Sequence, residues 1–130
     1  MRRWIRDRDR VLRFALARTS EEMNARGVLR SSIHLAALAE IRHQALYEYR
    51  GEVSRKRRRY RKLLDAAPSG FKLPRLVLDD ASRSTLARWR APVIVPGMDD
   101  EVAVDDPTDP ALEPEIRGFE ARGDGPDDAP

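Results

Sequence analysis

Cysteine is missing from this chain, and aromatic residues make up only 6% of it. Without cysteine the chain forms no disulfide, no thiolate nucleophile and no cysteine-ligated zinc site. No apolar run approaches the roughly 18 residues of a membrane-spanning helix, so integral membrane association is not expected. With 36% charged residues among 130, the chain has material for one domain with a small core.

The motifs of common enzymes and metal sites are also missing. The sequence contains no Gly-rich phosphate loop, nucleophile elbow or paired-carboxylate constellation. His34 and His43 fall on opposite sides of a helix, and Glu40 with His43 forms only half of a di-metal bundle site. We therefore predict a protein that is not an enzyme, with no cofactor, no metal and no small-molecule substrate. Its histidines are expected at the surface or at an interface.

The charge that is present is sorted by position. Residues 1–65 carry a net charge of +10, residues 66–97 carry +3 and residues 98–130 carry −10. The densest part is a basic octet made of Arg55, Lys56, Arg57, Arg58, Arg59, Tyr60, Arg61 and Lys62. The octet predicts an anionic partner. Charges from Arg6 to Arg10 stand where the apolar part of a secretory signal would begin, which favours a cytoplasmic protein.

Residues 3–26 and 32–67 have the periodicity of helices. Between them, Gly27 suits the left-handed conformation that follows a helix, and Ser31 or Ser32 offers a hydroxyl that caps the next one. So short a connection brings successive helices side by side in opposite directions. We therefore predict an all-α fold in which the first unit, residues 1–67, is an antiparallel helical hairpin.

The second helix is long, and one stripe of it is apolar. Over residues 32–67 it is roughly 50 Å long, whereas a compact domain of about 100 residues has a radius of gyration of about 13 Å. The stripe has a spacing between the coiled-coil and straight-helix periods. Because the first helix is too short to cover it, we predict a homodimer or larger oligomer. The predicted interface contains Leu38, Ile41, Ala45, Tyr49, Val53, Tyr60 and Leu63.

Residues 68–97 are predicted to form a small irregular cap. A brief helix begins at Asp79 or Asp80 and ends near Arg90, and prolines keep the segment that follows extended. Residues 98–130 are acidic and rich in proline and glycine, which is the composition of a disordered tail.

Two features of this acidic tail point to interactions. Leu112, Ile116 and Phe119 have the spacing of a short helix that docks in a groove, although Pro114 weakens that pattern. The tail also balances the charge of the basic half, so we expect it to compete with an anionic partner for the octet. The alternative is that the tail only keeps a basic protein in solution.

The octet itself allows two interpretations. On a helix it surrounds the axis with positive charge, which a phosphate backbone would neutralise with release of counterions. The other interpretation is a solvated helix end whose cations suit the helix dipole. We expect a non-enzymatic protein that binds a polyanion through the octet, most simply the backbone of a nucleic acid without sequence specificity.

One stretch resembles a known group of proteins. Asn24-Ala25-Arg26-Gly27-Val28-Leu29-Arg30-Ser31-Ser32, followed by a long charged helix, is similar to helical hairpins in some bacteriophage neck, tail and assembly proteins. This resemblance implies the alternative function, a structural or assembly protein of a larger particle such as a virion. In that case the basic helix meets an acidic protein surface, and the protein is virion-associated.

Overall fold

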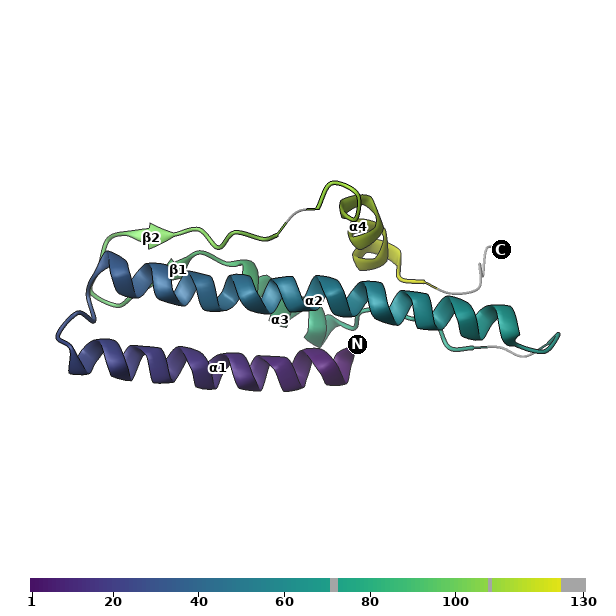
Figure 1. Cartoon of the computed structure of the whole chain (residues 1–130), viewed down its shortest axis with the longest axis horizontal. Coiled ribbons are helices and arrows are strands. Elements are labelled where there is room, and N and C mark those ends of the chain that lie inside the picture. The colour runs from purple at the N-terminus through teal and green to yellow at the C-terminus, as the bar shows by residue number, and fades with distance from the viewer. Residues whose placement is uncertain (71–72, 108, 125–130) are drawn as a thin grey trace.

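Two antiparallel helices form the frame of the molecule (Figure 1). The computed structural model describes residues 1–70, 73–107 and 109–124. The elements in chain order are α1 (Arg2–Ala25), α2 (Ser32–Ala66), α3 (Asp80–Arg90), β1 (Val93–Ile94), β2 (Glu101–Val102) and α4 (Glu113–Arg122). The predicted mainly helical fold is therefore confirmed within the described residues. No helix in these ranges is both long enough and apolar enough to cross a membrane.

The turn between α1 and α2 is built as the sequence predicts. Gly27 adopts a left-handed backbone with φ of +72° after α1. The Ser31 hydroxyl accepts a hydrogen bond from the His34 amide at 3.2 Å, which caps α2. The prediction for His34 is wrong: its ring is buried and lies within 3.0 Å of the Ser20 hydroxyl and 2.6 Å of the Leu29 carbonyl. This histidine lies in the first turn of α2, and its ring connects α2 to the end of α1 and to the hairpin turn.

The main core lies where α1, α2, α3 and α4 meet. Its largest fully buried side chains are Ile5, Leu12, Leu46, Tyr49, Val53, Trp89 and Phe119. Trp89 donates its indole hydrogen to Asp9 Oδ1 at 2.9 Å, so these two buried polar groups satisfy each other. A smaller cluster packs Val93 and Val95 against Leu35, so the extended segment after α3 lies across the start of α2.

The apolar stripe of α2 is buried inside this chain, which corrects the interface prediction. Leu38, Ala45, Tyr49, Val53 and Tyr60 are all buried in the single chain, and Ile41 packs at the edge of the core. Only Leu63 of the predicted interface is exposed. From the sequence, α1 is the only expected cover of this stripe, whereas α3, β1 and α4 also lie against α2 in the structure. The reason for expecting a homo-oligomer through this stripe is therefore removed.

The acidic tail predicted for residues 98–130, from here on called the acidic segment, also differs from its prediction. A disordered tail was expected from Met98 onward, yet Ile116 and Phe119 of α4 are buried in the main core, and β2 pairs with β1. Pro114 lies in the first turn of α4, where its missing amide hydrogen costs nothing. The docking helix predicted from this spacing thus occupies a site on its own chain. Residues 125–130 of the predicted tail lie outside the described residues.

Candidate anion-binding surface

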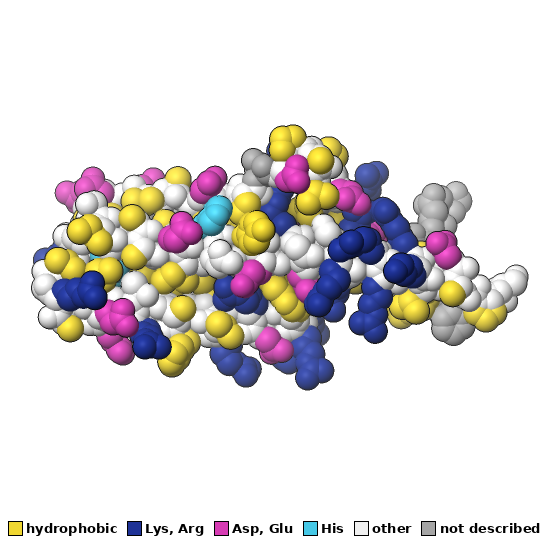
Figure 2. All heavy atoms as spheres, in the orientation of Figure 1, with side chains coloured by type: hydrophobic (Ala, Val, Ile, Leu, Met, Phe, Trp, Pro, Cys, Tyr) yellow, Lys and Arg dark blue, Asp and Glu magenta, His cyan; other side chains and the backbone are white. Residues whose placement is uncertain are grey.

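The basic octet occupies the far end of α2, which extends beyond the N-terminus of α1 (Figure 1). The structure divides the octet into two sides. Arg57 and Tyr60 are buried and Lys56 is half-buried. The other five side chains are exposed: Arg55, Arg58, Arg59, Arg61 and Lys62. Figure 2 shows basic side chains gathered over this end of the molecule.

Four of the exposed cations share one face. Arg55, Arg58, Arg59 and Lys62 follow the spacing i, i+3, i+4, i+7, and together they line a shallow groove. Arg55 is bound by Glu52 at 2.5 Å, and its pKa is raised by that hydrogen bond. Within the described part of the chain, the other three form no ion pair. We call these four residues the basic face.

The buried side of the octet is neutralised by the acidic segment. Arg57 donates two hydrogen bonds to Asp124, one of them 3.1 Å long, and lies 2.7 Å from Glu115. The pKa of Arg57 is raised, chiefly by the hydrogen bond to Asp124 and against the opposing effect of desolvation. Arg61 is 3.8 Å from the same Glu115, at the boundary between the two sides. Arg57 is therefore a structural residue that holds the end of α4.

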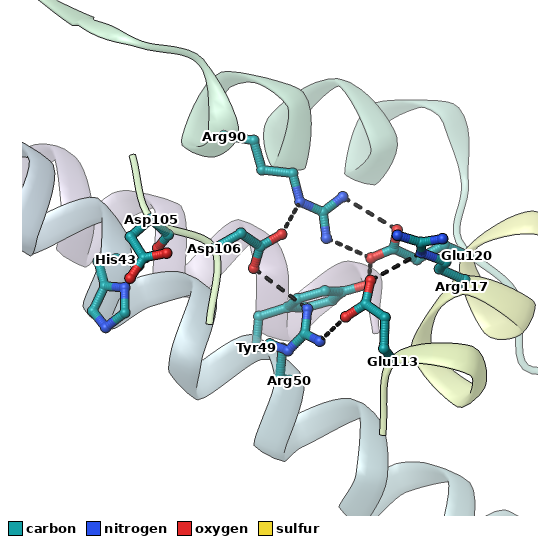
Figure 3. Close-up of polar contacts among 9 residues, drawn as sticks. All are labelled: His43, Tyr49, Arg50, Arg90, Asp105, Asp106, Glu113, Arg117 and Glu120. Atoms are coloured by element: carbon teal, nitrogen blue, oxygen red, sulfur yellow. Dashed lines mark hydrogen bonds and ion pairs between the residues drawn. The ribbon is translucent and has the colours of Figure 1, made fainter. Parts of the chain in front are cut away.

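A second group of ion pairs fastens the acidic segment further back along α2 (Figure 3). Arg90 of α3 binds Asp106 at 3.0 Å and Glu120 at 2.6 Å. Arg50 of α2 binds the same Asp106 at 3.4 Å and also Glu113 of α4. Each arginine thus bridges the loop before α4 and α4 itself. The network joins three helices and one loop around a small, partly buried volume.

Tyr49 connects this network to the core. Its hydroxyl donates a hydrogen bond to Glu120 at 3.0 Å, and Arg90 lies 5.9 Å from the centre of its ring (Figure 3). Burial and the adjacent Glu120 raise the pKa of Tyr49 above its ordinary value, so the hydroxyl keeps its proton and remains a donor. At the edge of the same region, His43 Nδ1 lies 2.6 Å from the Asp105 carbonyl oxygen.

The pairing of Glu113 makes the docking of α4 sensitive to acid. Arg50 donates a hydrogen bond that lowers the pKa of Glu113, against an opposing effect of desolvation, and Arg117 adds a second bond. Because this pKa is lower in the folded state, the stabilisation is present at neutral pH and is lost as the pH falls through the folded value.

We expect Glu113→Gln to lower the melting temperature at pH 7 and to match the unmodified protein in acid below the pKa of Glu113. Thermal unfolding followed by circular dichroism tests this, with exposed Glu21→Gln as the control. A constant difference at all pH values contradicts it.

The sequence pointed to the octet and to the acidic tail as a competitor for it, but not to the individual partner residues. It could not separate Arg57 from Arg58, and it missed Asp106, Glu115 and Asp124, which lie more than 50 residues away from their partners on α2. The available signal was the equal and opposite charge of the two halves. Among the described residues, no group of three or more His, Asp or Glu side chains could hold a metal ion.

The basic face on the projecting end of α2 is a dense group of cations, and three of its four side chains form no ion pair among the described residues. Its cations are exposed and lie on one side of α2, whereas Arg57 and Tyr60 of the same helix are buried. Comparison with known proteins adds no constraint on what this face binds. No protein-family model, no curated protein and no solved structure matches this chain.

Proposed function

We propose that this protein binds a polyanion, the backbone of a nucleic acid without sequence specificity, through the basic face. The observation that carries the proposal is the placement of Arg55, Arg58, Arg59 and Lys62 on one exposed face at the projecting end of α2. The binding site is smaller than the octet, because Arg57 and Tyr60 are held inside the chain. Arg61 lies at its margin.

The charges on the basic face repel one another in the free protein. Arg55 with Arg59 and Arg58 with Lys62 are like-charge pairs one helical turn apart, each unfavourable by about 0.2–0.5 kcal/mol. A row of phosphates relieves this repulsion and releases its own counterions on binding. The planar guanidinium fork of arginine matches two phosphate oxygens at once. Contacts of this kind fix position on the backbone but do not read bases.

Neutralising the basic face is expected to weaken binding to every nucleic-acid sequence equally. In the triple variant Arg58→Gln, Arg59→Gln and Lys62→Gln, the slope of log affinity against log salt falls by about 0.9 for each lost duplex contact. Loss of all three contacts lowers the slope by about 2.7. Fluorescence anisotropy with two unrelated 20-base-pair duplexes, measured at several salt concentrations, gives this slope.

The control removes the same charge elsewhere. Arg10 and Arg18 on α1 and Arg83 on α3 are exposed, and a triple glutamine variant at these positions has the same net charge. This control variant should keep most of the slope of log affinity against log salt. Equal losses in both triple variants would mean that only net charge matters, and an unchanged slope in the first variant would refute the proposal.

A second candidate is an assembly role, in which the basic face meets an acidic protein surface of a larger particle. Leu63, which is 51% exposed at the same end of α2, favours it, because an apolar contact strengthens a protein interface but not a phosphate contact. Leu63→Ser discriminates between the two. It should leave the affinity for duplex DNA unchanged in the first case and weaken a salt-resistant protein complex in the second.

A further inference from the structure

A groove with an apolar floor lies far from the basic face, between α1 and the end of α3. It measures about 300 Å³. The buried Leu12 and Trp89 form its floor, and the more exposed Leu16, Pro92 and Ile94 complete its apolar lining. Ile94 is 68% exposed, although it belongs to β1 and follows the buried Val93. The groove thus offers apolar surface that nothing in the described chain covers.

Three arginines surround this apolar floor. Arg13 comes from α1, Arg42 from α2 and Arg88 from α3, whereas Asp9 is the one carboxylate among the described lining residues. Asp9 is already fully engaged, since Oδ1 accepts the Trp89 indole hydrogen and Oδ2 lies 3.0 Å from Arg13 and 3.3 Å from Arg88. The groove therefore has an excess of positive charge.

Arg42 is the least compensated of the three. One of its nitrogens donates to the Ala91 carbonyl at 3.0 Å, which fixes the side chain at the groove without neutralising it. Partial burial lowers the pKa of Arg42, and the nearby positive charge of Arg88 lowers it further. An anion placed between Arg42 and Arg88 would oppose both effects, because its charge favours the charged form of each guanidinium.

We propose that this groove binds a peptide segment of another protein in which a carboxylate stands beside an aliphatic or aromatic side chain. The carboxylate meets Arg42 and Arg88, and the apolar side chain packs against the exposed Ile94 above the floor of the groove. Charge complementarity selects an acidic segment, and the apolar floor selects against a bare phosphate backbone. Helix α4 and the residue that follows it closely are not the occupant, because Glu113 binds Arg50, Glu120 binds Arg90 and Asp124 binds Arg57.

A random heptapeptide display library selected on the full chain tests the proposal. We expect the enriched peptides to carry Asp or Glu next to Leu, Ile, Phe or Trp. No enrichment, or enrichment of neutral or basic peptides, overturns the proposal. So does enrichment of acidic peptides that lose binding in the triple variant of the basic face, because those peptides would be bound at the other site.

Ile94→Asp locates the peptides without disturbing the core. Because Ile94 is exposed, the variant should stay folded, with only a small fall in melting temperature from the new carboxylate opposite Glu101 across the β1–β2 pair. The same carboxylate repels an acidic peptide in the groove and lowers its affinity about tenfold or more. The matched control is Ile33→Asp, an equally exposed isoleucine, at 64%, that does not line the groove. Its affinity should stay within about twofold of the unmodified protein. Equal affinity in the two variants overturns the proposal.

Discussion

Replacement of Phe119 by Ala is expected to lower the free energy of unfolding by about 3–5 kcal/mol. The ring is 1% exposed and belongs to the main core together with Tyr49 and Trp89. Its loss leaves a cavity beneath α4, and α4 has only Ile116 as a second fully buried side chain. Domains of this size have about 5–15 kcal/mol in total, so the change removes a large part of the stability.

A phenylalanine on the surface provides the control for this measurement. Phe14 on α1 is 70% exposed, and Phe14→Ala should change the free energy of unfolding by less than about 0.5 kcal/mol. Urea titration followed by circular dichroism measures both variants under the same conditions. If Phe119→Ala is as mild as Phe14→Ala, α4 does not contribute to the core, and the acidic segment is the loose tail that its composition suggests.

Local structure was predictable wherever neighbouring residues determine it. The turn at Gly27 and the cap at Ser31 follow from backbone sterics and from the unpaired amides of a helix start. Asp79 likewise accepts a hydrogen bond from the Ser82 amide at 2.9 Å and begins α3 as expected. These features need no information from distant parts of the chain.

The identity of distant partners was not predictable in the same way. The periodicity of α2 showed that Leu38 and Val53 would be buried, but a period does not say which surface covers them. A composition rich in acids, proline and glycine favours disorder only while the acids remain solvated. Here Glu113 binds Arg50 and Asp124 binds Arg57, two buried arginines of α2. These contacts are determined by the tertiary fold.

The basic octet shows where a helical-wheel argument falls short. Its eight residues cover the full circumference of α2, so some of them had to face the protein. Arg57 and Tyr60 do so because they continue the line of Tyr49 and Val53 at helical steps of three and four residues. The sequence analysis places Tyr49, Val53 and Tyr60 in the apolar stripe, and it places both Arg57 and Tyr60 in the octet. Only the acidic partners show that a buried arginine is tolerated there.

Replacement of Tyr49 by Asp is expected to unfold the protein rather than to dissociate an oligomer. Tyr49 is fully buried, lies 6.5 Å from Trp4 between ring centres, and donates its hydroxyl to Glu120. An aspartate at this position loses the ring contacts and places a charged carboxylate in the main core, where the Tyr49 side chain is fully buried. The combined cost is about 4 kcal/mol or more, which belongs to the largest effects of single substitutions.

Two matched variants separate unfolding from dissociation. Tyr47→Asp lies two residues away on the same helix at a position that is 61% exposed, and it should change stability by less than about 0.5 kcal/mol. Tyr49→Phe removes only the hydrogen bond to Glu120, which Arg90 still pairs, and should cost about 0.5–1.5 kcal/mol while the protein stays folded.

Circular dichroism measures the helical signal of each variant, and sedimentation measures its mass under the same conditions. If Tyr49→Asp keeps its helical signal and its mass falls below that of the unmodified protein, the stripe is an interface between chains after all. If the helical signal is lost while both matched variants remain folded, the stripe is the core of this chain.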